Sequence, residues 1–158
     1  MKLNAARGWR FGNKDNFVIT DENGAERFTS KGNVIKQQLF DPSGNLVGVL
    51  DSGLQVATAS QVREYTIYVG GEKKGTYSRK EKIIGYEYEF VDIPWTFDRG
   101  EDKIKQGDTV IATLTDTASF FFHLISFAPR KYEADIPNEE DAVMAALISL
   151  GWHYFEAR

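Results

Sequence analysis

Two histidines are the first candidates for chemistry, because imidazole is the side chain whose ordinary pKa lies closest to neutral pH. His123 lies in the apolar run FFFHLI, and His153 lies in the apolar stretch AVMAALISLGWHYF. The thirty residues between them match no spacing of metal ligands, and few acid–base partners lie near His123 in sequence. We therefore interpret His123 as a hydrogen-bonded core residue and predict no metal site.

Carboxylates are the second candidates, since a pair of them can act as general acid and base. Glu87 and Glu89 share one face of a predicted strand, and a solvated strand face is the simpler interpretation. Four other carboxylates occupy predicted turns or strand ends: Asp21, Asp41, Asp51 and Asp116. The chain has no cysteine, no glycine-rich phosphate loop and no nucleophile elbow. We predict no catalytic residue and no cofactor, so a hydrolase-type enzyme is the least favoured alternative.

The basic segment EKKGTYSRKEK, residues 72–82, is the stronger candidate for a site. The whole chain has a formal net charge of −4, but this segment carries only two glutamates against five cations. The cations are Lys73, Lys74, Arg79, Lys80 and Lys82. Basic residues beside a membrane attract anionic lipid. The alternative is a lysine-rich strand edge that prevents aggregation. The acidic pI of about 5.2 argues against nucleic acid as a partner.

The elements that would position these residues are mostly short strands. NFVIT leads into DENG, QQLF into DPSG and YTIYV into GG, which are strand-to-turn patterns, and the first two recur at an offset of 20 residues. In GYEYEFVDI, tyrosines alternate with glutamates. Eleven or twelve strand candidates over residues 16–136 predict an antiparallel sandwich or barrel in a single domain, 1–158. Residues 1–15 are polar and interrupted by glycine, and they predict no clear strand.

A helix over residues 139–154 is predicted after Asn138, which is a suitable N-cap. Its first turn is acidic, as the helix dipole favours, and it then runs apolar on all sides. Such a helix is buried on all sides, and the fourteen-residue apolar stretch spans about 21 Å, too short for a bilayer. The sheet is therefore predicted to curl around the helix, with Trp152 to Phe155 either plugging its mouth or forming an exposed tip.

The order of these motifs resembles the LURF-one-related group of tubby C-terminal-like proteins, whose distant relatives include the phospholipid scramblases. The similarity covers residues 16–152 and rests on FVITDENGAERF, LFDPSGNLVGVL, YTIYVGGEKKGTYSRK and YEADIPNEEDAVMAALISL. It implies a closed antiparallel barrel of about twelve strands around a hydrophobic helix. It also implies a relation to tubby domains, which bind phosphoinositides through a basic surface.

These inferences together predict a non-enzymatic tubby-like binding or scaffold module. Its predicted partner is anionic phospholipid, bound at the basic segment, or another protein. A carrier of a small apolar ligand inside the barrel is the main alternative, and a filled interior argues against it. The lack of a signal peptide or a membrane-length apolar run predicts a cytoplasmic, non-transmembrane protein. Four aromatic residues are expected to pack beneath the barrel ends: Trp9, Phe11, Trp95 and Phe97.

Overall fold

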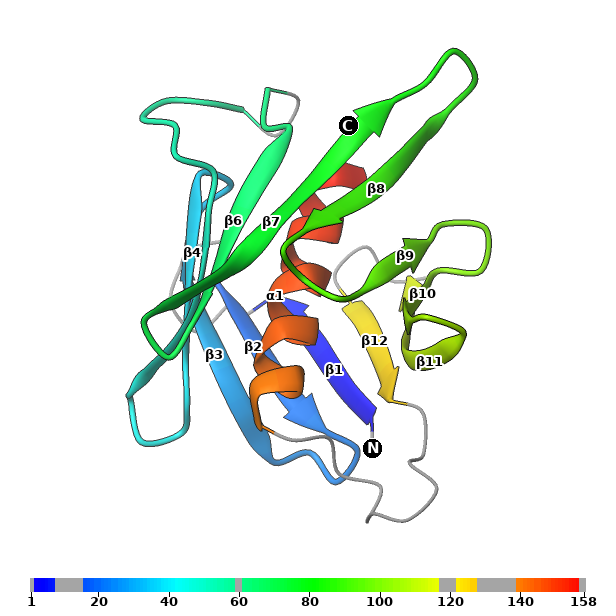
Figure 1. Cartoon of the computed structure of the whole chain (residues 1–158). Coiled ribbons are helices and arrows are strands. Elements are labelled where there is room, and N and C mark those ends of the chain that lie inside the picture. Colours follow the sequence, from blue (N-terminus) through cyan, green and yellow to red (C-terminus); the bar gives the residue numbers. More distant parts are fainter. Residues whose placement is uncertain (1, 8–15, 59–60, 117–121, 128–138, 157–158) are drawn as a thin grey trace.

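The computed structural model describes residues 2–7, 16–58, 61–116, 122–127 and 139–156 (Figure 1). These residues form twelve strands and one helix, so the predicted mainly β class with a C-terminal helix is confirmed. The strands are β1 (Lys2–Arg7), β2 (Phe17–Asp21), β3 (Glu26–Gly32), β4 (Lys36–Phe40), β5 (Leu46–Asp51), β6 (Glu64–Val69), β7 (Glu72–Glu81), β8 (Tyr86–Val91), β9 (Thr96–Asp98), β10 (Lys103–Gln106), β11 (Thr109–Asp116) and β12 (Phe122–Phe127). The helix is α1 (Glu139–Glu156).

All twelve strands belong to one antiparallel sheet in the order β8-β7-β6-β5-β4-β3-β2-β1-β12-β11-β10-β9. Every neighbour in space is also a neighbour in sequence except at the pairing of β1 with β12. The sheet surrounds much of α1 (Figure 1). Its hydrogen-bonded order ends at β8 and β9, so the described ladder is an open sheet with two edges and not a closed hydrogen-bonded barrel.

Strand β1 lies in a segment for which the sequence predicted no clear strand, and that prediction was wrong. The segment KLNAAR pairs with β2 on one side and with β12 on the other. Leu3 and Ala5 point into the core and are fully buried. The apolar signal is weak because the inward positions hold only one large side chain, and the two flanking ladders supply the missing stabilisation.

The two turns that recur at an offset of 20 residues close neighbouring hairpins, β2–β3 and β4–β5. In each, the aspartate Oδ1 accepts hydrogen bonds from two backbone N–H groups, at 2.9 and 3.0 Å for Asp21 and at 2.9 Å twice for Asp41. Gly24 and Gly44 close the turns at φ values of 82° and 86°. The backbone N–H of Asn45, above all, lowers the pKa of Asp41. The repeat in sequence is therefore a repeat of hairpins.

Helix α1 is the core of the molecule, as its composition predicts. Residues 142–152 are all buried, including Ser149. The packing against the sheet is tight at two glycines. A Cβ on Gly48 of β5 would lie 2.7 Å from Val143, and one on Gly151 would lie 2.8 Å from the Tyr77 ring of β7. No helix among the described residues combines the length and the apolar character needed to cross a membrane.

The end of α1 remains inside the sheet, so of the two positions that the sequence left open, plug or exposed tip, the structure has the plug. Trp152 and Tyr154 are each 4% exposed and Phe155 is fully buried. The Tyr154 hydroxyl accepts a hydrogen bond of 2.7 Å from Nε2 of Gln37. Bulky aromatic residues fit here because Tyr65 and Tyr77 provide ring contacts to Phe155 at centroid distances of 5.4 and 5.1 Å.

Two of the four aromatic residues expected beneath the ends of the sheet are in the described residues. Trp95 is 4% exposed and Phe97 is 7% exposed, which confirms that they pack inward. Trp9 and Phe11 lie outside the described residues, as does Asn138, the predicted N-cap.

Candidate functional site

The five cations of the basic segment lie along a single strand and just beyond it. Four of them belong to β7 and the fifth follows in the turn to β8: Lys73, Lys74, Arg79, Lys80 and Lys82. Because β7 has ten residues, its ends are about 30 Å apart. The structure therefore does not bring the five together. Strand β7 is paired on both sides only at residues 76–78, since residues 72–75 pair with β6 alone and residues 79–81 with β8 alone, so the edge-protection alternative stays open for its two ends.

Lys74 is engaged at the N-terminal end of α1. Its Nζ lies 2.7 Å from Glu140 in the first helical turn and 3.5 Å from Glu72. The hydrogen bond to Glu140 is the main cause of the raised pKa of Lys74. Lys74 therefore ties a strand to the helix, and its charge is balanced before any ligand arrives.

Arg79 is engaged at the opposite end of α1. Its side chain is only 12% exposed, and Nη1 donates a 2.6 Å hydrogen bond to the backbone oxygen of Phe155. Its Nε lies 3.1 Å from a Glu81 oxygen, and its guanidinium lies 3.6 Å from the centroid of the Tyr86 ring. Carbonyls in the last helical turn have no partner within the helix, so this contact is a C-terminal cap. Arg79 is a structural residue.

Glu156 completes the attachment of the helix end, and sequence reasoning missed it. It accepts hydrogen bonds from the hydroxyls of Tyr86, at 2.7 and 2.8 Å, and of Tyr88. Burial is the main cause of the raised pKa of Tyr88, which favours its role as a donor. Arg99 packs on the Tyr86 ring at 4.1 Å and donates to the Tyr86 carbonyl at 2.8 Å. The inward alternation of the tyrosines in GYEYEF was the available signal for this cluster.

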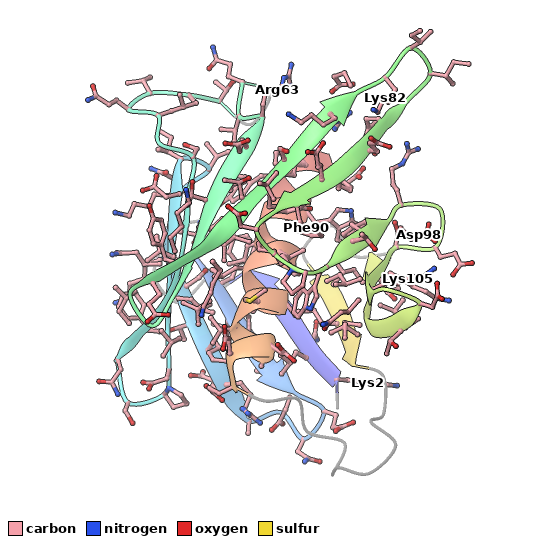
Figure 2. The ribbon with its side chains drawn as sticks, viewed as in Figure 1. Lys2, Arg63, Lys82, Phe90, Asp98 and Lys105 are labelled. Atoms are coloured by element: carbon pink, nitrogen blue, oxygen red, sulfur yellow. The ribbon has the colours of Figure 1, made fainter. Side chains whose placement is uncertain are left out.

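Three cations of the segment face outward. Within the described residues, Lys73 and Lys80 are exposed and form no ion pair. Lys82 forms a 2.8 Å ion pair with Glu87, and both side chains are about half exposed. That contact is the main cause of the raised pKa of Lys82. Lys82 lies near the tip of the β7–β8 hairpin, which projects beyond the rest of the sheet (Figure 2), and Lys80 lies two residues before it on β7.

The described side chains among the residues considered for catalysis are not gathered into a reaction centre. Glu87 and Glu89 are exposed on β8, as a solvated strand face requires. His153 is partly buried with its ring 5.4 Å from that of Phe17, and the side chain of His123 lies outside the described residues. In the described part of the chain, no three His, Asp or Glu side chains are placed to hold a metal ion.

A hollow with charged walls lies at the N-terminal end of α1. Its volume is about 190 Å³, and its lining includes Lys74, Asp92, Glu140 and Asp141 above an apolar floor. The ion pair between Lys74 and Glu140 already occupies one wall. This hollow therefore presents three carboxylates and one neutralised cation, which is unsuited to an anionic ligand.

Comparison with known proteins gives a fold and no family. Neither a model of a known protein family nor a curated protein sequence matches the chain. Among solved structures, the chain is similar to the X-ray structure of a protein from Arabidopsis thaliana, with a TM-score of 0.54 and 20% sequence identity. The similarity covers 95% of this chain and 89% of that chain. At this identity the similarity shows that the two proteins share a fold.

Proposed function

We propose that this protein is a non-enzymatic binding module that works from the outside of its sheet. The observation that carries this proposal is the filled interior. The residues of α1 from 142 to 152 are buried, and at Gly48 and Gly151 the helix lies closer to the sheet than a Cβ would allow. An apolar ligand would have no volume inside, which disfavours the alternative of an internal carrier.

We propose further that the fold is a tubby-like barrel whose two edges meet through side chains. Tyr88 of β8 and Phe97 of β9 pack with ring centroids 4.8 Å apart, although the two strands are not hydrogen-bonded neighbours. The connecting segment places Ile93 and Trp95 in the core. Both contacts support a sheet that closes around α1, and they agree with the resemblance to the LURF-one-related group.

The proposed partner is the headgroup of an anionic phospholipid, bound by Lys80 and Lys82. These two lysines lie beside the same exposed carboxylate of the projecting hairpin, since Lys80 is paired with Glu87 in the register and Lys82 contacts Glu87 at 2.8 Å. The exposed ion pair of Lys82 with Glu87 is weak enough to be exchanged for a phosphate. A module of this kind in the cytoplasm would meet the anionic membrane leaflet that faces that compartment.

Binding to vesicles tests this proposal. We expect the wild-type protein to sediment with vesicles of phosphatidylcholine and phosphatidylserine at low salt, and to bind phosphatidylcholine alone much more weakly. The double substitution Lys80→Gln/Lys82→Gln should lower the affinity by about tenfold. Lys73→Gln is the matched control, because Lys73 is also exposed but lies at the far end of β7. Equal binding by the double variant and the wild type would refute the assignment.

A further inference from the structure

The tip of the β7–β8 hairpin carries two isoleucines in full contact with solvent. Ile83 has a relative exposure of 105% and Ile84 of 92%. They occupy the centre of a turn in which the N–H of Lys82 donates a 3.0 Å hydrogen bond to the Gly85 oxygen. Gly85 adopts a φ of 74°, so it satisfies the backbone demand of the turn. We call residues 82–85 the hairpin tip.

Turn geometry does not explain these isoleucines. The β3–β4 turn contains Val34 and Ile35, which are partly buried, whereas four other described hairpins turn through polar residues, glycine or proline: residues 22–24, 42–44, 70–71 and 107–108. Those residue types either adopt turn conformations readily or bond their own backbone, and isoleucine does neither. Two large apolar side chains fully exposed on a projection are typical of a surface that is covered by a partner.

A second apolar feature lies at the same end of the sheet. The register pairs Asp51 with Thr66, Glu64 with Ser78 and Glu81 with Tyr86, so the β5–β6 loop and the hairpin tip leave the sheet in the same direction. Both extend past the C-terminal end of α1 (Figure 1). In that loop, Val56 is 91% exposed and Leu54 is 45% exposed.

We infer that the hairpin tip inserts into the boundary between headgroups and acyl chains of a phospholipid bilayer, an inference that rests on the proposed function. Ile83 and Ile84 lie deepest, and Lys80 follows three residues behind Ile83, at about 10 Å. This separation matches the 5–10 Å over which apolar groups of interfacial proteins enter the bilayer. Lys80 then lies level with the phosphates, and Lys82, next to Ile83, reaches them with its long side chain. A bilayer is a better partner than a protein groove. The apolar residues stand at the tip of the hairpin and the basic residues behind them, in the same order as the acyl chains and the phosphates of a leaflet.

Electrostatic attraction alone would bind this hairpin only weakly to an anionic membrane, so the apolar tip is needed for binding. Lys80 and Lys82 have Glu81, Glu87 and Glu89 as near neighbours on the hairpin, so the long-range attraction to an anionic surface is small. Insertion of the two isoleucines supplies a contribution that does not depend on salt.

The base of the hairpin is fixed, so the tip is presented without a large loss of entropy on binding. Arg79 and Arg99 pack on the Tyr86 ring at 3.6 and 4.1 Å, and Tyr86 bonds Glu156 of α1. A rigid projection keeps its binding residues in place before contact with the partner.

Removal of the apolar groups is the first arm of the test. The double substitution Ile83→Ser/Ile84→Ser should lower partitioning onto phosphatidylcholine–phosphatidylserine vesicles by about tenfold or more and make the residual binding more sensitive to salt. The fold should be unchanged, because neither side chain contributes to the core. Leu46→Ser is the matched control. Leu46 is 48% exposed and begins β5, whereas the other end of β5, at Asp51, lies at the same end of the sheet as the hairpin tip.

Insertion depth is the second arm, and the lack of cysteine in the chain makes it direct. A single cysteine at Ile84→Cys, labelled with a nitrobenzoxadiazole fluorophore, should shift to the blue on vesicles and be quenched by lipids that carry a nitroxide near the headgroup. The same label at Ser43→Cys, in the β4–β5 turn, should stay in water.

The outcomes separate the inference from the proposed function. If the wild type binds anionic vesicles, the Ile83/Ile84 variant binds equally and the label at position 84 stays in water, then insertion is overturned and headgroup binding stands. If label insertion occurs equally with and without phosphatidylserine, insertion stands and headgroup selectivity fails. If the wild type binds no vesicle at all, both are overturned.

Discussion

The two ends of α1 are held by the same strand in different ways. At the N-terminal end, Lys74 of β7 forms a partly exposed ion pair with Glu140. At the C-terminal end, the largely buried Arg79 donates to the Phe155 carbonyl, and two tyrosine hydroxyls donate to Glu156. Strand β7 therefore contacts α1 near both ends of the helix.

The difference between Lys74 and Arg79 shows that the positive charge of a side chain does not by itself identify what the side chain does in the fold. A cation near a helix C-terminus complements the dipole and satisfies carbonyls that have no other partner, so Arg79 is in a favourable position. Near the N-terminus the dipole opposes a cation, and Lys74 is held there by carboxylates. The C-terminal attachment should therefore be the stronger of the two.

The largest expected effect comes from the segment between the two ends. Leu147→Lys places an ammonium group at a fully buried position, and no carboxylate is among the buried residues that the structure describes. Burial of an unpaired charge should cost several kcal/mol and abolish folding. Circular dichroism and soluble yield measure the outcome. Glu139→Gln, at the exposed first turn, is the control that should fold, and a soluble, folded Leu147→Lys protein would contradict the central-helix arrangement.

An intermediate effect should distinguish the two ends themselves. Arg79→Ala removes a charged hydrogen bond from a mostly buried site and should reduce the free energy of unfolding by about 2 kcal/mol. Lys74→Ala removes an ion pair that water reaches, so its effect should be smaller. Urea denaturation of both variants measures the difference. A larger loss for Lys74→Ala than for Arg79→Ala would reverse the proposed order.

The smallest effect is expected at Tyr77, which packs against the C-terminal end of α1. Its hydroxyl is buried without a hydrogen-bond partner in the described residues, so Tyr77→Phe should leave stability equal or raise it by up to about 1 kcal/mol. A lower stability near neutral pH would show that the hydroxyl has a partner after all.

The same variant also has an expected dependence on pH. Burial is the main cause of the raised pKa of Tyr77, whereas the unfolded chain ionises near the ordinary value of 10.0. The contribution of Tyr77 is therefore present below pH 10 and is lost as the pH rises above it. Because phenylalanine does not ionise, Tyr77→Phe should lose less stability than the wild type above pH 10.

The features that local sequence predicts well are those that depend on neighbouring residues. The aspartate turns at Asp21 and Asp41, the alternation of Tyr86 and Tyr88, and the burial of the helix all follow from short patterns. Each of these depends on residues within a few positions of one another, and the structure agrees with each.

Features set by long-range pairing could not be predicted in this way. Whether Arg79 faces the helix and Lys80 faces solvent depends on the register of β7 against β6 and β8, which no local pattern fixes. Strand β1 exists because two distant strands pair with it. The isoleucines at 83 and 84 did leave a signal in the sequence. They follow the charged run that ends at Lys82 and precede Gly85, at positions where turn residues are usual.

The position of α1 in the chain has a consequence for the route to the native state. The helix follows all twelve strands, so a growing polypeptide makes its sheet before the element that fills it. Consecutive strands pair with short loops and form early at low entropic cost, whereas the apolar inner faces stay uncovered until residues 139–156 are made. The nascent sheet is then at risk of self-association, and arrival of the helix converts it to a packed domain in one late, cooperative step.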